Sequence, residues 1–379
     1  MDFDLTEEQS MLKDSLKRLL ADNYGFEQRR KYMAAAEGWS GEMWGRYAEM
    51  GLMALPFDEA DGGLGGSAVE TMIVMEEMGR ALVLEPYYST VVLGGAVLRF
   101  GASEDQRAEY IPQVAEGGLK LALAHTERNS RYDLSSVETM ARKDGDGWVL
   151  SGAKSVVLDG DGADRLFVTA RSAGGTREEA GIGIFMVDGK AEGLSRRGYP
   201  MQDGRRGAEV RLDNVRAEAI GEAENGFPLL SRVADAGIAA LCAEAIGTMD
   251  VMRELTVDYL KTRKQFGVPI GAFQVLQHAA VDMFVATEQA RSLAVYATMM
   301  ADSEDAAERG RAMHAAKAEI GRAGKLVGEN AIQLHGGVGM TMEYAIGHYF
   351  KRMSMIDIQL GDHEHHLRAL AQKGGLIEA

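Results

Sequence analysis

Hydrophobic periodicity changes twice along this chain, from helical to alternating and back to helical. In residues 1–118 apolar side chains recur at steps of three and four, as in "TEEQSMLKDSLKRLL", which opens with a capping-box pattern at Thr6. Residues 119–225 form short alternating runs between turn residues, and residues 226–379 return to long stretches of helical period. The sequence therefore predicts a helical domain, a β-domain and a second helical domain with these boundaries.

Each domain carries its own architectural signal. The "DGDG" at 144–147 lies between two alternating runs and predicts a hairpin, so that about six strands would form a small β-barrel or sandwich. The Ala-, Met- and Leu-lined stretches after residue 226 are typical of a four-helix bundle. At 379 residues the chain exceeds the roughly 250–300 residues that one core supports, which favours several domains. The predicted fold is mostly α with a central β-domain.

Composition restricts the partners and the compartment. The 41 basic and 57 acidic residues give a net charge of −16, which argues against nucleic acid or an anionic membrane as the main partner. The single cysteine, Cys242, lies in an apolar helical run and predicts a small core residue, not half of an internal disulfide. The sequence shows neither a leader-like start nor a stretch of about 18 apolar residues, and we expect a cytoplasmic protein outside the membrane.

The stretch "IDIQLGDHEHH" at 356–366 gathers three carboxylates and three histidines. A metal site in a helical bundle would need such groups at helical spacing on facing helices, and no second Glu-x-x-His pattern occurs in the chain. No metal is therefore predicted. The stretch is better interpreted as the start of the last helix, with Asp362 as its cap and the histidines on a polar first turn.

Two further stretches resemble the acyl-CoA dehydrogenase family: "YLKTRKQFGVPIGAFQVLQH" (259–278) and "AIQLHGGVGMTMEYAIGHYFKR" (331–352). The resemblance covers essentially the whole chain, because "DFDLTEEQ", "GGLGG" and "GDGWVLSGAKSVV" also look like family elements. Within the family the chain is most similar to the small subunit of pimeloyl-CoA dehydrogenase. The resemblance implies FAD held across a subunit interface, α,β-desaturation of an acyl-CoA and electron transfer to an electron-transfer flavoprotein. An acyl-CoA oxidase ranks lower, because chains of that class tend to be longer.

The resemblance also implies an assembly and a substrate class. The expected assembly is a homodimer, a homotetramer or a heterotetramer with a homologous large subunit. The expected substrate is a dicarboxylic or ring-derived acyl-CoA. Arg128 and Arg131, in the turn "HTERNSRYDL" (125–134), are candidates to meet a distal carboxylate, although solvated arginines are the commoner case.

The flavin-binding residues are implied one position at a time by the same resemblance. Arg263 matches the arginine that pairs with the FAD pyrophosphate of the neighbouring subunit, a task suited to the fork of a guanidinium. In the β-domain Thr126 is retained, while Val156 and Leu158 stand where the family has aromatic and hydroxyl contacts to the flavin. The remaining implied cofactor residues are Phe266, Gln274, Gln333, Gly336, Gly337 and Asp362.

The catalytic base does not follow the family pattern. The two places where the family carries its base match Leu360 and Gly237, and the arginine that helps to position CoA matches Ile238. One interpretation is an active dehydrogenase whose base has moved to Asp362 or Glu244, where burial would raise the pKa of a carboxylate. Asp362 is alternatively a flavin contact or a helix cap, and Glu244 alternatively pairs with a basic residue on a neighbouring helix. The other interpretation is a partner subunit whose homologue supplies the base.

Overall fold

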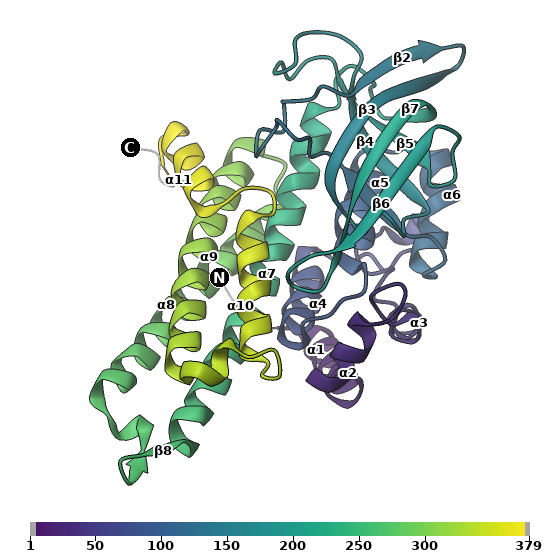
Figure 1. The fold of residues 1–379 in the computed structure, drawn as a ribbon. Coiled ribbons are helices and arrows are strands. Elements are labelled where there is room, and N and C mark those ends of the chain that lie inside the picture. The colour runs from purple at the N-terminus through teal and green to yellow at the C-terminus, as the bar shows by residue number, and fades with distance from the viewer. Residues whose placement is uncertain (1–4, 376–379) are drawn as a thin grey trace. The chain divides into compact units, whose positions relative to one another are not determined.

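A computed structural model describes residues 5–375 and divides the chain into two compact units. The first, here called the bundle unit, combines Met1–Lys31, Ala68–Val83 and Ile238–Ala379. The second, the barrel unit, combines Tyr32–Ser67 and Leu84–Gly237. The predicted order of helical, β and helical parts is confirmed along the chain (Figure 1). The exact boundaries of three sequence domains stay a prediction.

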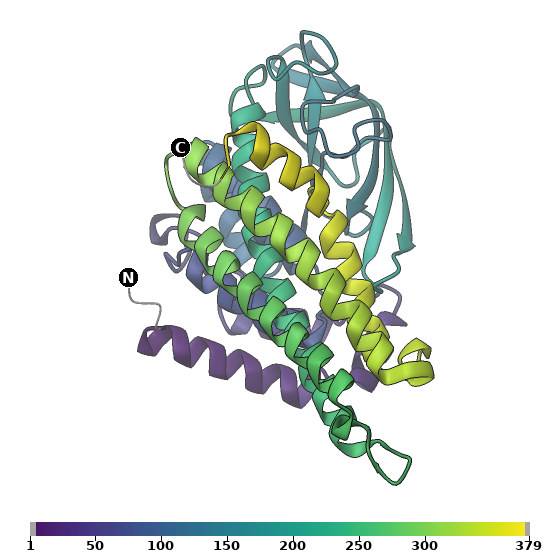
Figure 2. The ribbon, with the colours of Figure 1, turned by 90° about the vertical axis from the view of Figure 1, so that its left-hand side faces the viewer.

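Long helices make up the bundle unit. Helix α9 packs against α8, α10 and α11, and α8 and α9 lie side by side in two views (Figures 1 and 2). The expected bundle of long helices is thus present, and α1 packs on α4 beside it. The helices that lie wholly or mostly in this unit are α1 (Glu7–Asn23), α2 (Phe26–Met33), α4 (Ala68–Ala81), α7 (Phe227–Thr262), α8 (Gln274–Ala301), α9 (Ala306–His335), α10 (Ile346–Ile358) and α11 (His363–Gln372).

Two local signals in the bundle unit behave as the sequence predicts. Helix α1 begins with a capping box, in which the Thr6 hydroxyl accepts from the Gln9 amide and the Gln9 side chain accepts from the Thr6 amide. Cys242 is completely buried in α7, and burial raises the pKa of its thiol to about 12. The cysteine is therefore a core residue, as expected.

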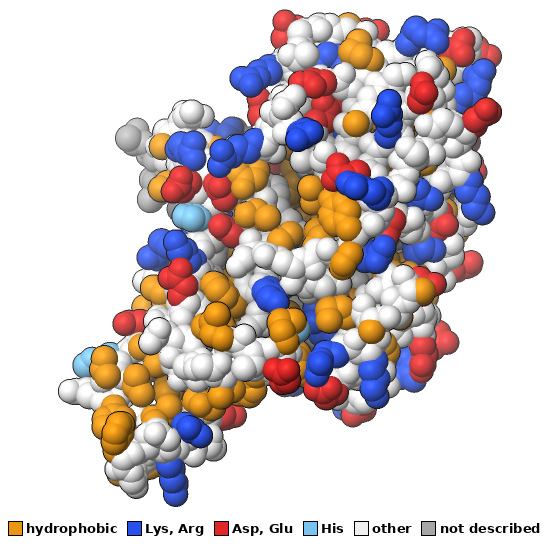
Figure 3. All heavy atoms as spheres, in the orientation of Figure 1, with side chains coloured by type: hydrophobic (Ala, Val, Ile, Leu, Met, Phe, Trp, Pro, Cys, Tyr) orange, Lys and Arg blue, Asp and Glu red, His pale blue; other side chains and the backbone are white. Residues whose placement is uncertain are grey.

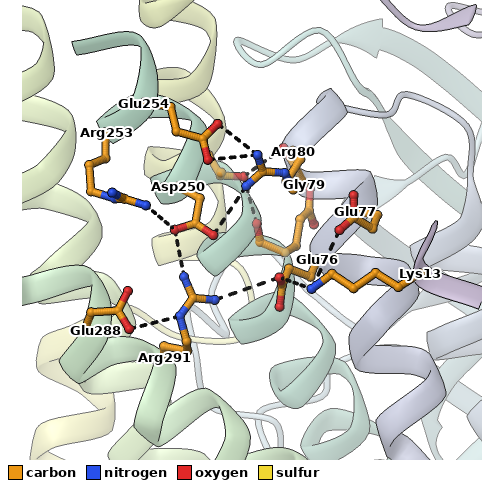
Figure 4. A network of polar contacts seen from close by, with 12 residues as sticks. Lys13, Glu76, Glu77, Gly79, Arg80, Asp250, Arg253, Glu254, Glu288 and Arg291 are labelled. Atoms are coloured by element: carbon orange, nitrogen blue, oxygen red, sulfur yellow. Dashed lines mark hydrogen bonds and ion pairs between the residues drawn. The ribbon is translucent and has the colours of Figure 1, made fainter. Parts of the chain in front are cut away.

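Helices α4 and α7 cross closely because glycines stand at the crossing. A Cβ atom at Gly79 would overlap the carbonyl of Glu244, and one at Gly247 would overlap the carbonyl of Glu76. An ion network surrounds this crossing (Figure 4). Its centre is Asp250 on α7, which lies 2.7 Å from Arg291 of α8 and 3.4 Å from Arg80 of α4. The network links α7, which carries the candidate base Glu244, to α4 and α8.

The barrel unit is built on a sheet that closes on itself. Its strand order is β1-β4-β2-β3-β7-β5, and an additional pairing of β4 with β5 closes the ring, while β6 pairs with β7. The predicted hairpin is confirmed, since Asp144 pairs with Gly147 and Gly145 takes a φ of +61°. The strands are β1 (Leu121–Ala124), β2 (Met140–Asp144), β3 (Gly147–Leu158), β4 (Arg165–Arg171), β5 (Ile182–Asp188), β6 (Leu194–Pro200) and β7 (Arg206–Ile220).

Shorter elements complete the two units. The barrel unit also contains α3 (Gly41–Glu49), η1 (Glu59–Asp61), η2 (Tyr88–Gly94), α5 (Gly95–Gly101) and α6 (Glu104–Ala115). In the bundle unit β8 (Lys264–Gln265), β9 (Val268–Pro269) and η3 (Ile270–Ala272) connect α7 to α8, and η4 (Gly336–Met340) follows α9. Within residues 5–375 no helix combines the length and apolarity needed to cross a bilayer.

Candidate functional site

The predicted nucleotide contacts after α7 lie on a tight hairpin. Strands β8 and β9 pair through Gln265 and Val268, and the two loop residues between them, Phe266 and Gly267, have φ values of +53° and +82°. The hairpin leaves Phe266 91% exposed, and Arg263 and Gln274 are exposed beside it. Three of the residues assigned to the flavin therefore point into solvent from one connection of the bundle unit.

The second group of predicted nucleotide contacts lies in the last turn of α9 and directly after it. Gln333 is exposed, and a Cβ atom added at Gly336 or Gly337 would meet no atom within 4 Å. His335 fixes this helix end, because its ring stacks on Tyr259 of α7 at 4.5 Å and its Nδ1 donates to the Ala331 carbonyl at 2.8 Å. That stack joins the ends of α7 and α9. Both groups of predicted residues thus share one end of the bundle unit.

In the barrel unit the turn that carries Thr126 is firmly anchored. The Thr126 hydroxyl lies 3.1 Å from Nε2 of His125, and the neighbouring Glu127 accepts a 2.6 Å hydrogen bond from Nζ of the fully buried Lys154. Burial acts to raise the pKa of Glu127, but the Lys154 ammonium together with hydrogen bonds from Thr139 holds that pKa below its usual value. The turn keeps the Thr126 hydroxyl that the resemblance assigns to the flavin, although the Pro and Gly of the family turn are absent.

Val156 and Leu158 occupy the end of β3. Val156 is 46% exposed and holds a φ of +53°, a left-handed conformation that is strained for a β-branched side chain. Neither side chain offers a hydrogen-bond donor. The backbone at 156 thus keeps an unusual conformation, while its side chain lacks the groups that the family places there.

The loop at the family base position presents Leu360, with a φ of +55°, and no carboxylate at that position. Asp362 caps α11, as predicted, by accepting a 2.8 Å hydrogen bond from the His365 amide. The prediction that all the histidines lie on a polar face is wrong for His366, which is only 1% exposed. Its ring points into the protein, where it contacts His314 and the Leu360 carbonyl.

Glu244 is fully buried on α7, where it faces Arg352 of α10. The guanidinium donates from Nε to Oε1 and from Nη2 to Oε2, each at 2.7 Å, and Arg352 is itself only 2% exposed. This is the bidentate geometry that guanidinium and carboxylate groups favour. Of the two uses foreseen for Glu244, the ion pair is the one that the structure contains.

Lys317 is the buried residue near this loop that the sequence reasoning missed. It is fully buried on α9, on the same face as Met313, Ala316 and Ile320. A lysine at a position of the apolar helical stripe is the signal that could have identified it. Arg128 and Arg131, the candidates for a distal carboxylate, are both exposed. No group of three or more histidine, cysteine or acidic side chains within residues 5–375 is arranged to hold a metal ion.

Comparisons with known proteins agree over most of the chain. Models of the N-terminal, middle and C-terminal domains of acyl-CoA dehydrogenases match residues 6–118, 122–215 and 224–375. The chain is 30% identical over 359 residues to acyl-CoA dehydrogenase FadE12 of Mycobacterium tuberculosis, covering 90% of this chain and 89% of that one.

Solved structures show the same fold. A variant of the Tcur3481-Tcur3483 steroid ACAD is 29% identical, with a TM-score of 0.89 and 97% of each chain covered. Butyryl-CoA dehydrogenase of Megasphaera elsdenii is 23% identical, with a TM-score of 0.89 and coverage of 98% of this chain and 99% of that one.

Proposed function

The chain belongs to the acyl-CoA dehydrogenase family of FAD-dependent oxidoreductases, and on that premise we propose that it works as one subunit of a heteromeric acyl-CoA dehydrogenase. It contributes residues that contact the pyrophosphate and ADP side of FAD, and a homologous subunit contributes the catalytic carboxylate. The observation that carries this proposal is a contrast within the bundle unit. The side chains proposed to contact the nucleotide are exposed and the glycines beside them face open space, whereas the position of the base carries Leu360.

The nucleotide side fits the cofactor. No ion pair engages the exposed guanidinium of Arg263 within residues 5–375, so its fork is available to phosphate oxygens. The backbone at Gly336 and Gly337 faces open space, which allows a ligand or a second chain to approach it. Since these groups face away from their own chain, they suit an FAD molecule seated mainly in the neighbouring subunit.

An exposed apolar surface adjoins these residues and supports the assembly. Figure 3 shows hydrophobic side chains gathered at the end of the bundle where Figure 1 marks β8. Apolar surface of this kind marks a protein interface more often than a solvent-facing region. Its most exposed members are Phe266 (91%), Val275 (72%), Val281 (57%), Phe284 (48%) and Val285 (46%). We assign this surface to the homologous subunit.

Neither Leu360 nor Glu244 is suited to act as the base. FAD, when held by these residues, would supply the acceptor for a hydride from Cβ of the acyl thioester, and a carboxylate would be needed to take the proton from Cα. Leu360 cannot accept a proton, and both carboxylate oxygens of Glu244 accept hydrogen bonds from Arg352. We therefore infer that this subunit orients the cofactor and that the deprotonation takes place in the partner.

The proposed substrate class rests on similarity to a solved relative. The 29% identity to a steroid acyl-CoA dehydrogenase over 97% of the chain favours a bulky, ring-derived acyl-CoA over a simple dicarboxylic one. An electron-transfer flavoprotein is the proposed acceptor of the electrons. A second candidate function keeps the base in this chain. It is favoured by Asp362, which is only partly buried and lies two residues beyond Leu360.

The test compares the chain alone with the chain co-expressed with a homologue encoded beside it. The visible spectrum reports bound flavin, and anaerobic addition of butyryl-CoA, glutaryl-CoA or cyclohexanecarboxyl-CoA reports its reduction. We expect the isolated chain to be colourless or not to bleach, and the complex to hold FAD that bleaches. An isolated chain whose flavin is bleached by any of these thioesters would overturn the subunit proposal.

Replacing Arg263 with Met should weaken FAD binding by the assembled complex about 10- to 100-fold, since charge-assisted hydrogen bonds are worth roughly 1.5–3 kcal/mol. The loss is measured by titrating the apo complex with FAD and following flavin fluorescence. Lys261→Met is the matched control, because Lys261 is also exposed and lies two residues earlier. Unchanged affinity for the Arg263 variant would remove this residue from the cofactor site.

Replacing Asp362 with Asn separates the two candidate functions. Asparagine caps a helix about as well as aspartate, so the fold should be unaffected. Under the subunit proposal the rate of flavin reduction in the complex, followed by stopped-flow absorbance, stays within about twofold of the wild type. A loss of about 100-fold or more, the usual minimum for removing a general base, would instead identify Asp362 as the base.

A further inference from the structure

The buried side chains of Lys317 and His366 form hydrogen bonds to backbone carbonyls in and beside the loop between α10 and α11. Nζ of Lys317 donates to the carbonyl oxygens of Asp357, at 2.8 Å, and of Gly361, at 2.7 Å. Nε2 of His366 lies 3.0 Å from the carbonyl oxygen of Leu360. Carbonyls before, at and after position 360 are therefore bound by side chains of α9 and α11.

The hydrogen bonds define the tautomers of two histidines. A carbonyl only accepts, so Nε2 of His366 carries the proton that it shares with Leu360, and a neutral ring then leaves Nδ1 as an acceptor. Nδ1 of His314 lies 2.9 Å from that atom and must be the donor. The result is a directed chain from His314 through His366 to the loop, with both rings neutral.

The surroundings keep these rings neutral. Burial, reinforced by the nearby Lys317 ammonium, lowers the pKa of His366 to about 2. Burial, with a smaller effect of Lys373, lowers that of His314 to about 4. The titratable and charged groups that face the three side chains are Cys242 on α7, Arg352 and Asp357 on α10, Asp362 in the loop, His365 on α11 and Lys373 after it.

Burying the polar side chains of Lys317 and His366 costs free energy, which their hydrogen bonds to the loop backbone must offset. Burying an ammonium or an imidazole is unfavourable when its hydrogen bonds are not replaced, and Lys317 and His366 are 0% and 1% exposed. Of the two hydrogen bonds that Lys317 donates within residues 5–375, one goes to the Asp357 carbonyl in the last turn of α10 and one to the Gly361 carbonyl directly after position 360. Leu360 itself has no intrinsic preference for its left-handed conformation. The backbone conformation of the loop is thus fixed by its hydrogen bonds to Lys317 and His366.

We propose that Lys317 and His366 are positioning residues that fix the backbone of residues 359–361 independently of the side chain at position 360. The inference deepens the proposed function and rests on it in one respect, because that function makes this segment the loop of the catalytic base. The chain has then lost the base and kept the structure that holds it. A loop fixed in this way also prevents Asp362 from moving into the place of residue 360.

Hydrogen exchange of the isolated chain, followed by mass spectrometry of peptides covering 357–366, tests the proposal. Lys317→Met and His366→Leu should each raise exchange of the loop amides about 10- to 100-fold, while peptides from α8 stay unchanged. Lys325→Met is the matched control, because Lys325 is exposed two turns further along α9. Equal protection of the loop in wild type and both variants would overturn the proposal.

His366→Gln provides a rescue that simple packing would not give. The Gln amide reaches as far as Nε2 and donates to the Leu360 carbonyl, so protection should return to within about threefold of wild type. If the Gln variant exchanges as fast as the Leu variant, the ring acts by packing and His366 is not a positioning residue.

A pH series adds a second reading. Each imidazole that opening exposes should raise the equilibrium constant for loop opening by up to about tenfold for each pH unit below 6.5, so the Gln variant should show about half of the wild-type slope. Equal slopes for wild type and His366→Gln would show that His366 does not fix the loop. Since the exchange measurements need neither FAD nor a partner, they succeed or fail separately from the flavin experiments that test the proposed function.

Discussion

Replacing Arg352 with Met is expected to lower the free energy of unfolding by about 3–5 kcal/mol. The reason is the carboxylate left behind. Glu244 is fully buried and receives both of its 2.7 Å hydrogen bonds from this guanidinium, so the variant would hold an uncompensated charge in the interior. Urea unfolding followed by circular dichroism, with wild type and variant at the same pH, measures the loss.

Removing both charges should recover most of that loss. A buried ion pair is often no more stable than apolar side chains of similar volume, so Glu244→Leu combined with Arg352→Met should lie within about 1–2 kcal/mol of wild type. Arg322→Met is the matched control, because Arg322 is 60% exposed and contacts Glu319 at 2.6 Å on the surface of α9. That change should cost less than about 1 kcal/mol.

The outcome also bears on the candidate base. A cost below about 1 kcal/mol for Arg352→Met would mean that Glu244 is stable without its partner, and the ion pair would no longer argue against a catalytic role. If the double variant folds and its complex with the homologous subunit keeps the rate of flavin reduction, Glu244 serves the bundle and not the chemistry.

Features set by neighbouring residues were predictable from the sequence. The capping box at Thr6, the hairpin at 144–147 and the Asp362 cap each depend on side chains within a few positions, and all three are present. The burial of Cys242 follows equally directly from the apolar stripe around it. Local chemistry and periodicity therefore account for most of the fold.

The buried polar groups were not predictable, because their partners are remote in the sequence. Glu244 and Arg352 are 108 positions apart, and Lys317 and Gly361 are 44 apart. Periodicity can show that a charged residue falls on a buried face, but it cannot identify the group that satisfies it. The inward turn of His366 was missed for the same reason, since His314 lies 52 positions earlier.

The flavin residues form an intermediate case. The motif at 259–278 supplied their identity through resemblance, and the structure adds that Arg263, Phe266 and Gln274 are exposed at one end of the bundle unit. A site shared between two chains satisfies its side chains only in the assembly. Their roles therefore stay proposals that depend on a second subunit.

Lowering the pH from 7 to 5 is expected to destabilise the protein, because three histidines held in the neutral form together cost about 6 kcal/mol before opposing groups are counted. Burial lowers the pKa of His125 and of His314 to about 4 and that of His366 to about 2. In the unfolded chain each imidazole titrates near 6.5. Between these values the unfolded state binds more protons than the native state, so stability falls as the pH falls.

The magnitude follows from the same linkage. At pH 5 an imidazole that stays neutral in the native state costs on the order of 2 kcal/mol, and the three together cost about 6 kcal/mol. The pKa values of His335 and His348 are also lowered by burial and act in the same direction. Asp159 acts in the opposite direction, since burial raises its pKa to about 6, and it offsets part of the loss.

Urea unfolding at pH 7.5, 6.5, 5.5 and 5 measures this dependence. His366→Gln removes one of the three imidazoles and should reduce the slope below pH 6 by about 1.4 kcal/mol for each pH unit. His278→Gln, at an exposed position of α8, is the matched control for exchanging an imidazole for an amide. A free energy of unfolding that stays constant between pH 7 and 5 would show that these rings take up protons without unfolding, which would remove the basis for the tautomers assigned behind the Leu360 loop.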